Sequence, residues 1–373
     1  MKKKLIAAVL ISLSMMLSAG CAEQSDTSST IKTETNTAQQ ATVSVKTDAF
    51  RSITDINGDL VNVPTEINKI VCRSGNGTSF LVGMGLADKL VGTADYVVTN
   101  PWCDKFYKGI SSLPTFGWSP SSEEIYAMNC DLVMVADPEV SASLRTDGIS
   151  AICYKQYNEK EIVESVVLLG ELFGQNAKAY SERWIEYYSE TNDYIESKIN
   201  TISEEEKPVV YYIYGQSNKG LGRTAGGDSI IEVLIEGAGG KFATSDLSND
   251  GPKITEEDAI SRNPDIILIS GIYSAELKDD LNNSPQWKQV PAVKNAAIYQ
   301  MPIGFISWDF YGVEYPLLKL WIAQQLYPDL IDIDMHQETK QFHKDFYGIE
   351  LTDDEVDYML NALAPDGNPY ETE

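Results

Sequence analysis

Short apolar runs alternate with longer amphipathic segments along most of this chain, and this alternation limits the fold more than any other sequence feature. Residues 131–136 (DLVMVA) and 265–270 (DIILIS) each contain at least four consecutive apolar residues, and similar short runs occupy residues 69–72, 149–154 and 209–214. Strands without polar alternation are buried on both faces, which is typical of parallel sheets covered by helices. The pattern predicts an α/β fold.

One αβ unit occurs twice. Residues 121–134 (SSEEIYAMNCDLVM) align with residues 255–268 (TEEDAISRNPDIIL) at a constant offset of 134. Each copy opens with a hydroxyl residue followed three places later by an acid, the signature of a helix N-terminus, and ends in an apolar strand. The repeat predicts two similar Rossmann-like lobes with parallel sheets. We place the lobes at residues 51–175 and 204–373.

A single helix is predicted between the lobes, over residues 176–203. Apolar and aromatic residues recur there at helical spacing, and the segment from 177 to 202 contains no proline or glycine. At 1.5 Å per residue a helix of that length extends about 39 Å. We expect one long rigid helix with a ligand cleft between the lobes and only limited closure of that cleft.

The N-terminus has the features of a secretion signal. Three lysines at positions 2–4 precede an apolar stretch over residues 5–17, which is short for a membrane span, and small residues lead to Cys21. This end resembles the lipobox of bacterial lipoproteins, although Ser18 stands where leucine is usual. We predict a signal peptide over residues 1–21, lipidation of Cys21, and a Ser/Thr-rich disordered tether over residues 22–50. The alternative is a plain secretory signal.

Charge and composition exclude several classes of function. Acidic residues outnumber basic ones by 55 to 29, giving a formal charge of −26, which repels nucleic acid. His336 and His343 are the only two histidines, so histidine-rich metal sites are disfavoured. Beyond Cys21 there are four cysteines with no CxxC spacing, and we expect free thiols. A metal site at the two histidines would need a third ligand, and packing or surface roles are favoured.

Several ordered blocks resemble the substrate-binding proteins of ABC importers that carry ferric siderophores, haem and cobalamin. The blocks cover roughly residues 50–350 and include DINGDLVNVP (55–64), GGDSIIEVLIEGAGG (226–240), ITEEDAISRNPDIILIS (254–270) and QQLYPDL (324–330). Membership would imply an extracytoplasmic lipid-anchored protein that captures a metal complex and delivers it to a permease dimer with its ATPase. We expect a monomer with no intrinsic cofactor, whose bound ligand is a ferric chelate.

Candidate ligand-binding residues follow the predicted strands, because ligands of open parallel sheets lie beyond the carboxyl ends of strands. Arg73, Ser74 and Asn76 follow the first strand, where bare amide groups at a helix N-terminus would suit an oxygen-rich ligand; the alternative is a glycine turn with a surface arginine. Tyr214 and Arg223 occupy the equivalent place in the second lobe.

Three further ligand-binding candidates are Arg145, Trp118 and Trp308. Arg145 follows the strand that ends at Ala136. Together with Arg73 and Arg223 it could clamp the oxygens of a chelate. The alternative is that each arginine only balances negative surface charge. Trp118 and Trp308 lie in loops expected to open toward the cleft, where their rings would cover a bulky chelate. The same set of cleft aromatic candidates includes Trp102, Phe116, Tyr273, Phe310 and Tyr311, and for Phe310 and Tyr311 a packing role is the alternative.

Two acids are candidates for docking to a permease. Glu123 and Glu257 align across the repeat, each in the first turn of its helix. The helix dipole alone favours acids there. The family resemblance implies one surface glutamate per lobe that meets arginines of the permease, with Glu124 and Glu256 as alternatives one residue away.

The function predicted is capture of an iron chelate, a siderophore, for an ABC importer. A corrinoid, haem, another small metal complex or an oxyanion remains an alternative cargo. An extracytoplasmic hydrolase is a second class of function, but the sequence has no GxSxG, HExxH or P-loop motif. A lipid-anchored adhesin or sensory module is the third.

Overall fold

A computed structural model of the chain describes residues 49–117, 119–214, 220–249, 251–271 and 274–369. The predicted signal peptide, Cys21 and residues 22–48 of the predicted tether lie outside these residues. Among the described residues no helix is both long and apolar enough to cross a membrane.

The first lobe is built on a parallel sheet of five strands in the order β5-β4-β3-β6-β7. A separate hairpin, β1 (Phe50–Thr54) and β2 (Leu60–Pro64), pairs antiparallel before it. The strands of the main sheet are β3 (Ile70–Cys72), β4 (Leu90–Ala94), β5 (Thr115–Phe116), β6 (Leu132–Val135) and β7 (Ala151–Cys153). Its helices are α1 (Gly75–Gly83), α2 (Asp95–Val98), α3 (Cys103–Phe106), α4 (Ser122–Met128), α5 (Pro138–Thr146) and α6 (Glu159–Phe173).

The second lobe has a parallel sheet of four strands in the order β11-β10-β8-β9. The strands are β8 (Val209–Ile213), β9 (Lys241–Phe242), β10 (Ile266–Ile269) and β11 (Ile298–Gln300). Its helices are α8 (Ile230–Gly237), α9 (Glu256–Ser261), α10 (Ser274–Asn283), α11 (Pro291–Lys294), α12 (Tyr315–Leu326), α13 (Met335–Tyr347) and α14 (Asp353–Leu360).

Both sheets are buried on two faces, which explains their uninterrupted apolar strands. In the first lobe, Val133 and Val135 of β6 pack with Ile125 of α4 and Leu144 of α5 in a small cluster. Leu132, on the opposite face of that strand, joins the main core. The second lobe repeats this arrangement, because one face packs against residues of α9 and α10 and the other joins the main core.

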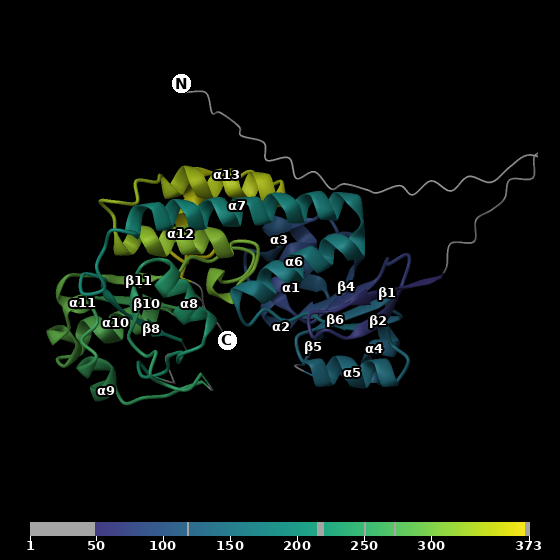
Figure 1. Ribbon diagram of the computed structural model, residues 1–373, viewed down its shortest axis with the longest axis horizontal. Coiled ribbons are helices and arrows are strands. Elements are labelled where there is room, and N and C mark those ends of the chain that lie inside the picture. The colour runs from purple at the N-terminus through teal and green to yellow at the C-terminus, as the bar shows by residue number, and fades with distance from the viewer. Residues whose placement is uncertain (1–48, 118, 215–219, 250, 272–273, 370–373) are drawn as a thin grey trace, which may run out of the picture. The chain divides into compact units, whose positions relative to one another are not determined.

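The long helix between the lobes is α7 (Gln175–Ile199), 25 residues in one run. Tyr180, Trp184, Tyr188 and Ile195 form its buried stripe. The helix packs on α6 of the first lobe and on α12 of the second, and Figure 1 shows it running beside both. Two parallel sheets in lobes joined by one long helix confirm the predicted fold class.

The predicted repeat is also visible in backbone detail. Ser121 caps α4 in a reciprocal capping box with Glu124, and Thr255 accepts a hydrogen bond from the Asp258 amide at the start of α9. Both helices are followed by an asparagine in the left-handed region, Asn129 (φ 47°) and Asn263 (φ 50°). These asparagines again differ by 134 positions, so the two copies share turn geometry as well as sequence.

A loop of the second lobe crosses to the first. We call residues 302–313 the crossing loop. Near its start, the Asn100 amide donates to the carbonyls of Gly304 (3.3 Å) and Phe305 (3.1 Å). At its end, the Val313 amide donates to Ser79 Oγ (3.2 Å), and Trp184 Nε1 of α7 donates to the Val313 carbonyl (2.8 Å). The loop is therefore held by the first lobe and by the long helix.

The four cysteines of the described residues are free, as predicted. Cys72, Cys103 and Cys153 are buried, and burial raises the pKa of the Cys72 thiol to about 11. A thiol that stays protonated is a poor nucleophile, so Cys72 serves packing.

Candidate functional site

Arg73 lies at the carboxyl end of β3, where the sequence predicted it. Its side chain is only 4% exposed. Nε donates to the Gly117 carbonyl (2.6 Å), and Nη2 lies 3.9 Å from a carboxylate oxygen of the exposed Asp95. Arg73 therefore supplies positive charge at the edge of the first lobe while its guanidinium is held within that lobe.

The amide groups that follow Arg73 are engaged by side chains. Ser74 caps α1 by accepting a hydrogen bond from the Gly77 amide (3.2 Å), and Tyr96 OH accepts one from the Gly75 amide (2.8 Å). The prediction of bare amides at this helix start is therefore wrong for both glycines. Asn76 is half-buried, and its Oδ1 accepts hydrogen bonds from the Ser74 hydroxyl and the Gly77 amide.

In the second lobe, Tyr214 directly follows β8 and pairs with Arg223. The Arg223 guanidinium lies 4.7 Å from the centre of the Tyr214 ring, and the Tyr214 amide donates to the Arg223 carbonyl (2.9 Å). Tyr214 also stacks on Tyr212, with ring centres 6.3 Å apart. Both Tyr214 and Arg223 are half-buried, so each presents part of its side chain to solvent.

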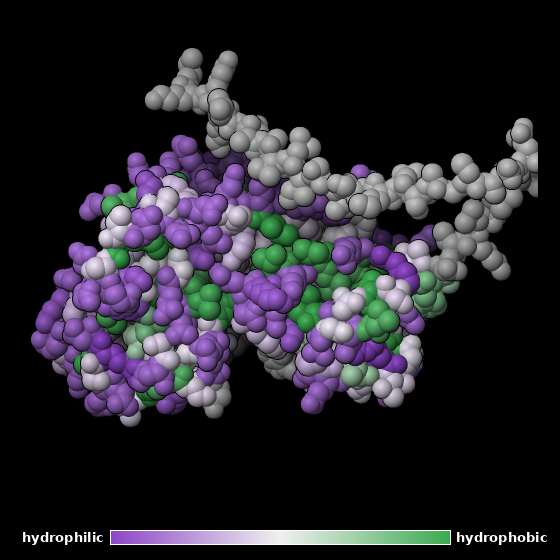
Figure 2. All heavy atoms as spheres, in the orientation of Figure 1, coloured by the Kyte–Doolittle hydropathy of each residue, from purple (hydrophilic) through white to green (hydrophobic). Residues whose placement is uncertain are grey.

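The crossing loop connects these two strand ends. Phe310 meets Tyr96 edge to face, with ring centres 5.6 Å apart. Asp309 is buried and accepts a hydrogen bond from Tyr212 OH (2.8 Å). A continuous series of contacts thus runs from Tyr96 beside Arg73, through the crossing loop, to Tyr212 beside Tyr214. Figure 2 shows the surface hollowed between the two lobes.

The phenol groups along this series remain neutral at physiological pH. Burial raises the pKa of Tyr96 to about 12, although the Gly75 amide and the Arg73 charge lower it in part. Burial also raises the pKa of Tyr212 and of Tyr311 above the ordinary value. Neutral phenols offer hydrogen bonds and flat apolar faces, which together suit a bulky ligand with oxygen atoms.

Tyr96, Tyr212 and Asp309 were missed by the sequence reasoning. Tyr96 comes two residues after the end of β4, so the rule that selected Arg73 and Tyr214 would have found it. Tyr212 lies inside a strand, and only the register of the sheet directs its hydroxyl toward Asp309. No sequence signal identifies that contact.

The predictions for Trp308 and Arg145 need correction. The Trp308 ring is fully buried and stacks on His343, so it presents no surface to a ligand. Arg145 lies in the last turn of α5 and forms ion pairs with Asp55 (3.3 Å) and Asp59 (2.7 Å) of the β1–β2 turn. Its guanidinium thus joins two elements of the first lobe. Trp118 lies outside the described residues.

The other aromatic candidates divide by burial. Trp102 and Phe116 are buried, whereas Phe310 and Tyr311 are half-buried on the crossing loop. Tyr273 lies outside the described residues. The prediction that Trp102 and Phe116 cover a ligand is therefore wrong, because both rings are buried in the core.

Neither histidine belongs to a metal-binding group. Among the described residues there is no cluster of three or more His, Cys, Asp or Glu side chains that could hold a metal ion. His336 lies near Asp353 and Asp357, while His343 is fully buried.

The two predicted docking acids are exposed on equivalent helices. Glu123 lies in the first turn of α4 and Glu257 in the first turn of α9. Their neighbours have structural partners, since Glu124 completes the capping box and Glu256 accepts a hydrogen bond from Trp287 Nε1 (3.1 Å). Each helix covers the sheet face opposite the one that joins the main core.

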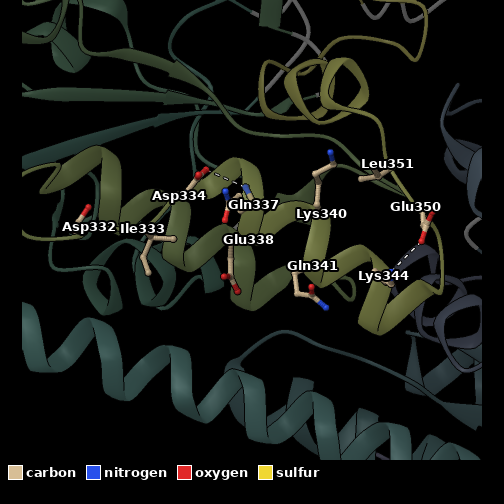
Figure 3. A pocket seen from close by; sticks show the side chains of 10 residues that line it. All are labelled: Asp332, Ile333, Asp334, Gln337, Glu338, Lys340, Gln341, Lys344, Glu350 and Leu351. Atoms are coloured by element: carbon tan, nitrogen blue, oxygen red, sulfur yellow. Dashed lines mark hydrogen bonds and ion pairs between the residues drawn. The ribbon is translucent and has the colours of Figure 1, made fainter. Parts of the chain in front are cut away.

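A surface pocket lies away from the strand ends, on α13. It has a volume of about 740 Å³, and Figure 3 shows its lining of mostly charged and amide side chains, with an ion pair between Lys344 and Glu350 (3.1 Å). Because the pocket is open and lacks aromatic residues, it has none of the features of a site for a bulky chelate.

The family model for periplasmic binding proteins matches residues 70–303, more than half of the chain. A similar relative is the uncharacterized ABC transporter substrate-binding lipoprotein YvrC of Bacillus subtilis, 24% identical over 88% of this chain and 99% of the relative. The iron(3+)-hydroxamate-binding protein FhuD of the same organism is 24% identical over 69% of this chain and 81% of the relative.

A solved structure agrees with these relatives. The periplasmic solute binding protein from Veillonella parvula superposes with a TM-score of 0.73 at 26% identity, covering 85% of this chain and 98% of that chain. The chain belongs to the periplasmic binding protein family. It is a substrate-binding protein of an ABC importer.

Proposed function

We propose that this binding protein captures a ferric chelate outside the cell. The observation that carries the proposal is the contact series between the lobes, with Arg73 near one end and Arg223 at the other. Ferric chelates of the siderophore type are bulky and rich in oxygen, so guanidinium groups suit their oxygens and aromatic rings suit their apolar faces. Similarity to a relative named for iron(3+)-hydroxamate binding supports the same cargo.

In this proposal the ligand-binding residues are Asn76, Tyr214 and Arg223, with Arg73 and Ser74 shaping the first-lobe edge. Phe310 and Tyr311 of the crossing loop supply ring surface. The metal arrives inside its chelate, and the protein contributes no intrinsic cofactor. The protein binds without turnover, in contrast to a hydrolase.

The proposal includes an anchored, extracytoplasmic protein that works as a monomer. Cys21 carries the lipid, and the tether lets the folded body reach a permease dimer with its ATPase. Glu123 and Glu257 dock on that permease, and their exposure on two equivalent helices supports this role. Rim charges of this kind mainly guide and orient partners.

Calorimetric titration of the purified chain tests the cargo. The panel contains a ferric hydroxamate, a ferric catecholate, cobalamin and haem, with each iron-free chelator as the matched control. We expect saturable binding of one molecule of a ferric chelate and weaker binding of its iron-free form. Binding of cobalamin or haem alone would reject the siderophore class, and formation of a product would favour the hydrolase.

A further inference from the structure

Glu314 is a fully buried acid at the junction of three elements. It directly follows the crossing loop and precedes α12. One carboxyl oxygen, Oε1, accepts a hydrogen bond from the Phe305 amide (3.2 Å), and the other accepts one from Tyr347 OH of α13 (2.9 Å). A single side chain therefore joins the start of the crossing loop to its end, and both to α13.

Two other polar groups adjoin this carboxyl group, and neither has a hydrogen-bond partner among the described residues. His343 Nε2 lies 3.8 Å from Glu314 Oε1, and the second is Trp308 Nε1. The other ring nitrogen of His343 lies 2.8 Å from the Thr339 carbonyl and must donate to it, so Nε2 of the neutral ring is an acceptor. A carboxylic acid, unlike a carboxylate, could donate toward it.

The packing around Glu314 is tight. A Cβ atom on Gly304 would lie 2.6 Å from Glu314 Oε1 and 2.9 Å from Trp308 Nε1, so only glycine lets the loop pass this close. The cluster is thus built from the loop backbone, α12 and α13 together.

Among the residues that the structure describes, no lysine or arginine forms an ion pair with Glu314. On α13 it faces His343 and Tyr347, and on α7 it lies near Tyr180, whose ring is covered by Arg183 at 5.9 Å. Within α12, Lys319 is paired with Glu159 (2.9 Å). On α1, Ser79 contributes a hydroxyl, and on the crossing loop Trp308 contributes an indole nitrogen.

We propose that Glu314 is a positioning residue that fastens the crossing loop to α13, and that ionisation of this buried acid, which has no lysine or arginine beside it among the described residues, weakens the fold around the loop. Burial raises the pKa of Glu314 to about 7 and lowers the pKa of His343 to about 4, so between these two pH values the acid, not the histidine, holds the proton. The pKa values of Tyr180 and Tyr347 are raised far above 10, so neither titrates there. This inference rests on the proposed function, because it treats the loop as part of the cargo site.

The sign of the pH dependence follows from proton linkage. A carboxyl group whose pKa is raised on folding stabilises the fold below its ordinary pKa of 4.5, and this contribution is lost as pH rises toward 7. His343 acts in the opposite sense, because its lowered pKa favours the fold above pH 6.5 and less so as pH falls toward 4. Glutamine at position 314 removes only the first of these effects.

The test compares Glu314→Gln with the unmodified chain by thermal unfolding, without cargo, from pH 5 to pH 8. We expect the unfolding midpoint of Glu314→Gln, taken relative to that of the unmodified chain, to rise by about 2–4 °C between pH 5 and pH 7, where the contribution of Glu314 is lost. Glu338→Gln is the matched control. Glu338 lies on α13 and, like Glu314, accepts a hydrogen bond from a tyrosine, Tyr187, but its side chain is partly exposed. A constant difference for Glu314→Gln, or the same gain in the control, would overturn the inference.

Cargo binding provides the second readout. With a ferric hydroxamate as the probe, Glu314→Gln should keep its Kd within about twofold, whereas Glu314→Ala should weaken binding about tenfold. If the alanine variant does not fold, the glutamine pH profile still decides. Equal Kd values for the alanine variant and the unmodified chain would overturn the positioning role. If the unmodified chain binds no chelate, the proposed function fails, and the unfolding series still tests the role of Glu314.

Discussion

At the scale of single residues, the three arginines predicted to clamp a ligand have different surroundings. Arg223 lies half-buried over the Tyr214 ring, Arg73 is held inside the edge of its lobe, and Arg145 pairs with two aspartates of a distant turn. A guanidinium contributes to binding only where it can reach the ligand, so the three substitutions should have different effects.

We expect Arg223→Ala to weaken binding of the ferric chelate about tenfold or more, because hydrogen bonds to charged groups contribute about 1.5–3 kcal/mol. Arg145→Ala should leave Kd unchanged and lower the free energy of unfolding by about 1 kcal/mol, since the buried Asp55 keeps its backbone hydrogen bonds. Calorimetry and urea unfolding measure the two effects. An equal loss of affinity in both variants would contradict the assignment of Arg223, and not Arg145, to the ligand-binding site.

The sequence could place Arg223 and Tyr214 together because both follow a strand, and strand ends of parallel sheets share one edge. It could not separate Trp308 from Phe310, although they are two residues apart. One ring is buried against His343 and the other meets Tyr96 of the first lobe. These contacts join residues 35 and 214 positions apart, and a local pattern does not encode them.

At the scale of elements, the repeated αβ unit was predictable down to its helix caps. Side-chain caps depend on residues three places apart, and the buried strands that follow are read from their composition. The same local chemistry gives the two neighbouring acids at the start of α4 different roles. Glu124 completes the capping box, whereas Glu123 is exposed and has no part in it.

We expect Glu124→Ala to lower the free energy of unfolding by about 1 kcal/mol through loss of the cap, with import unaffected when the protein is folded. The pair Glu123→Ala and Glu257→Ala should leave unfolding and cargo affinity unchanged and reduce cargo-dependent ATPase activity of the reconstituted importer. Full ATPase stimulation by the double variant would rule out docking by these two acids.

The contact of α7 with the crossing loop gives a second element-scale prediction. Trp184→Phe keeps a ring against Phe80 and Tyr188 but removes the hydrogen bond to the Val313 carbonyl. A buried carbonyl that loses its donor costs about 1–3 kcal/mol, which urea unfolding would detect. An unchanged free energy of unfolding would mean that this hydrogen bond does not stabilise the fold.

At the scale of the whole molecule, the two lobes and their connecting helix followed from the alternation of strands and helices, from the repeat, and from a long segment without glycine or proline. The crossing loop did not, because its role depends on Asn100, Ser79 and Trp184, which lie far away in the sequence. These anchors add to the stiffness expected from α7 alone.

We therefore expect little closure of the lobes when cargo binds. Small-angle scattering with and without a saturating ferric chelate should give radii of gyration that differ by less than about 1 Å. A larger decrease in the radius of gyration would show that α7 bends or that the contacts of the crossing loop break when cargo binds.

A crystal structure of the chain with a bound ferric chelate tests the central claim most directly. The account predicts the chelate between the lobes, in contact with Arg223 and with Phe310 of the crossing loop. A chelate bound in the pocket on α13, or on one lobe without contact to the crossing loop, would contradict it.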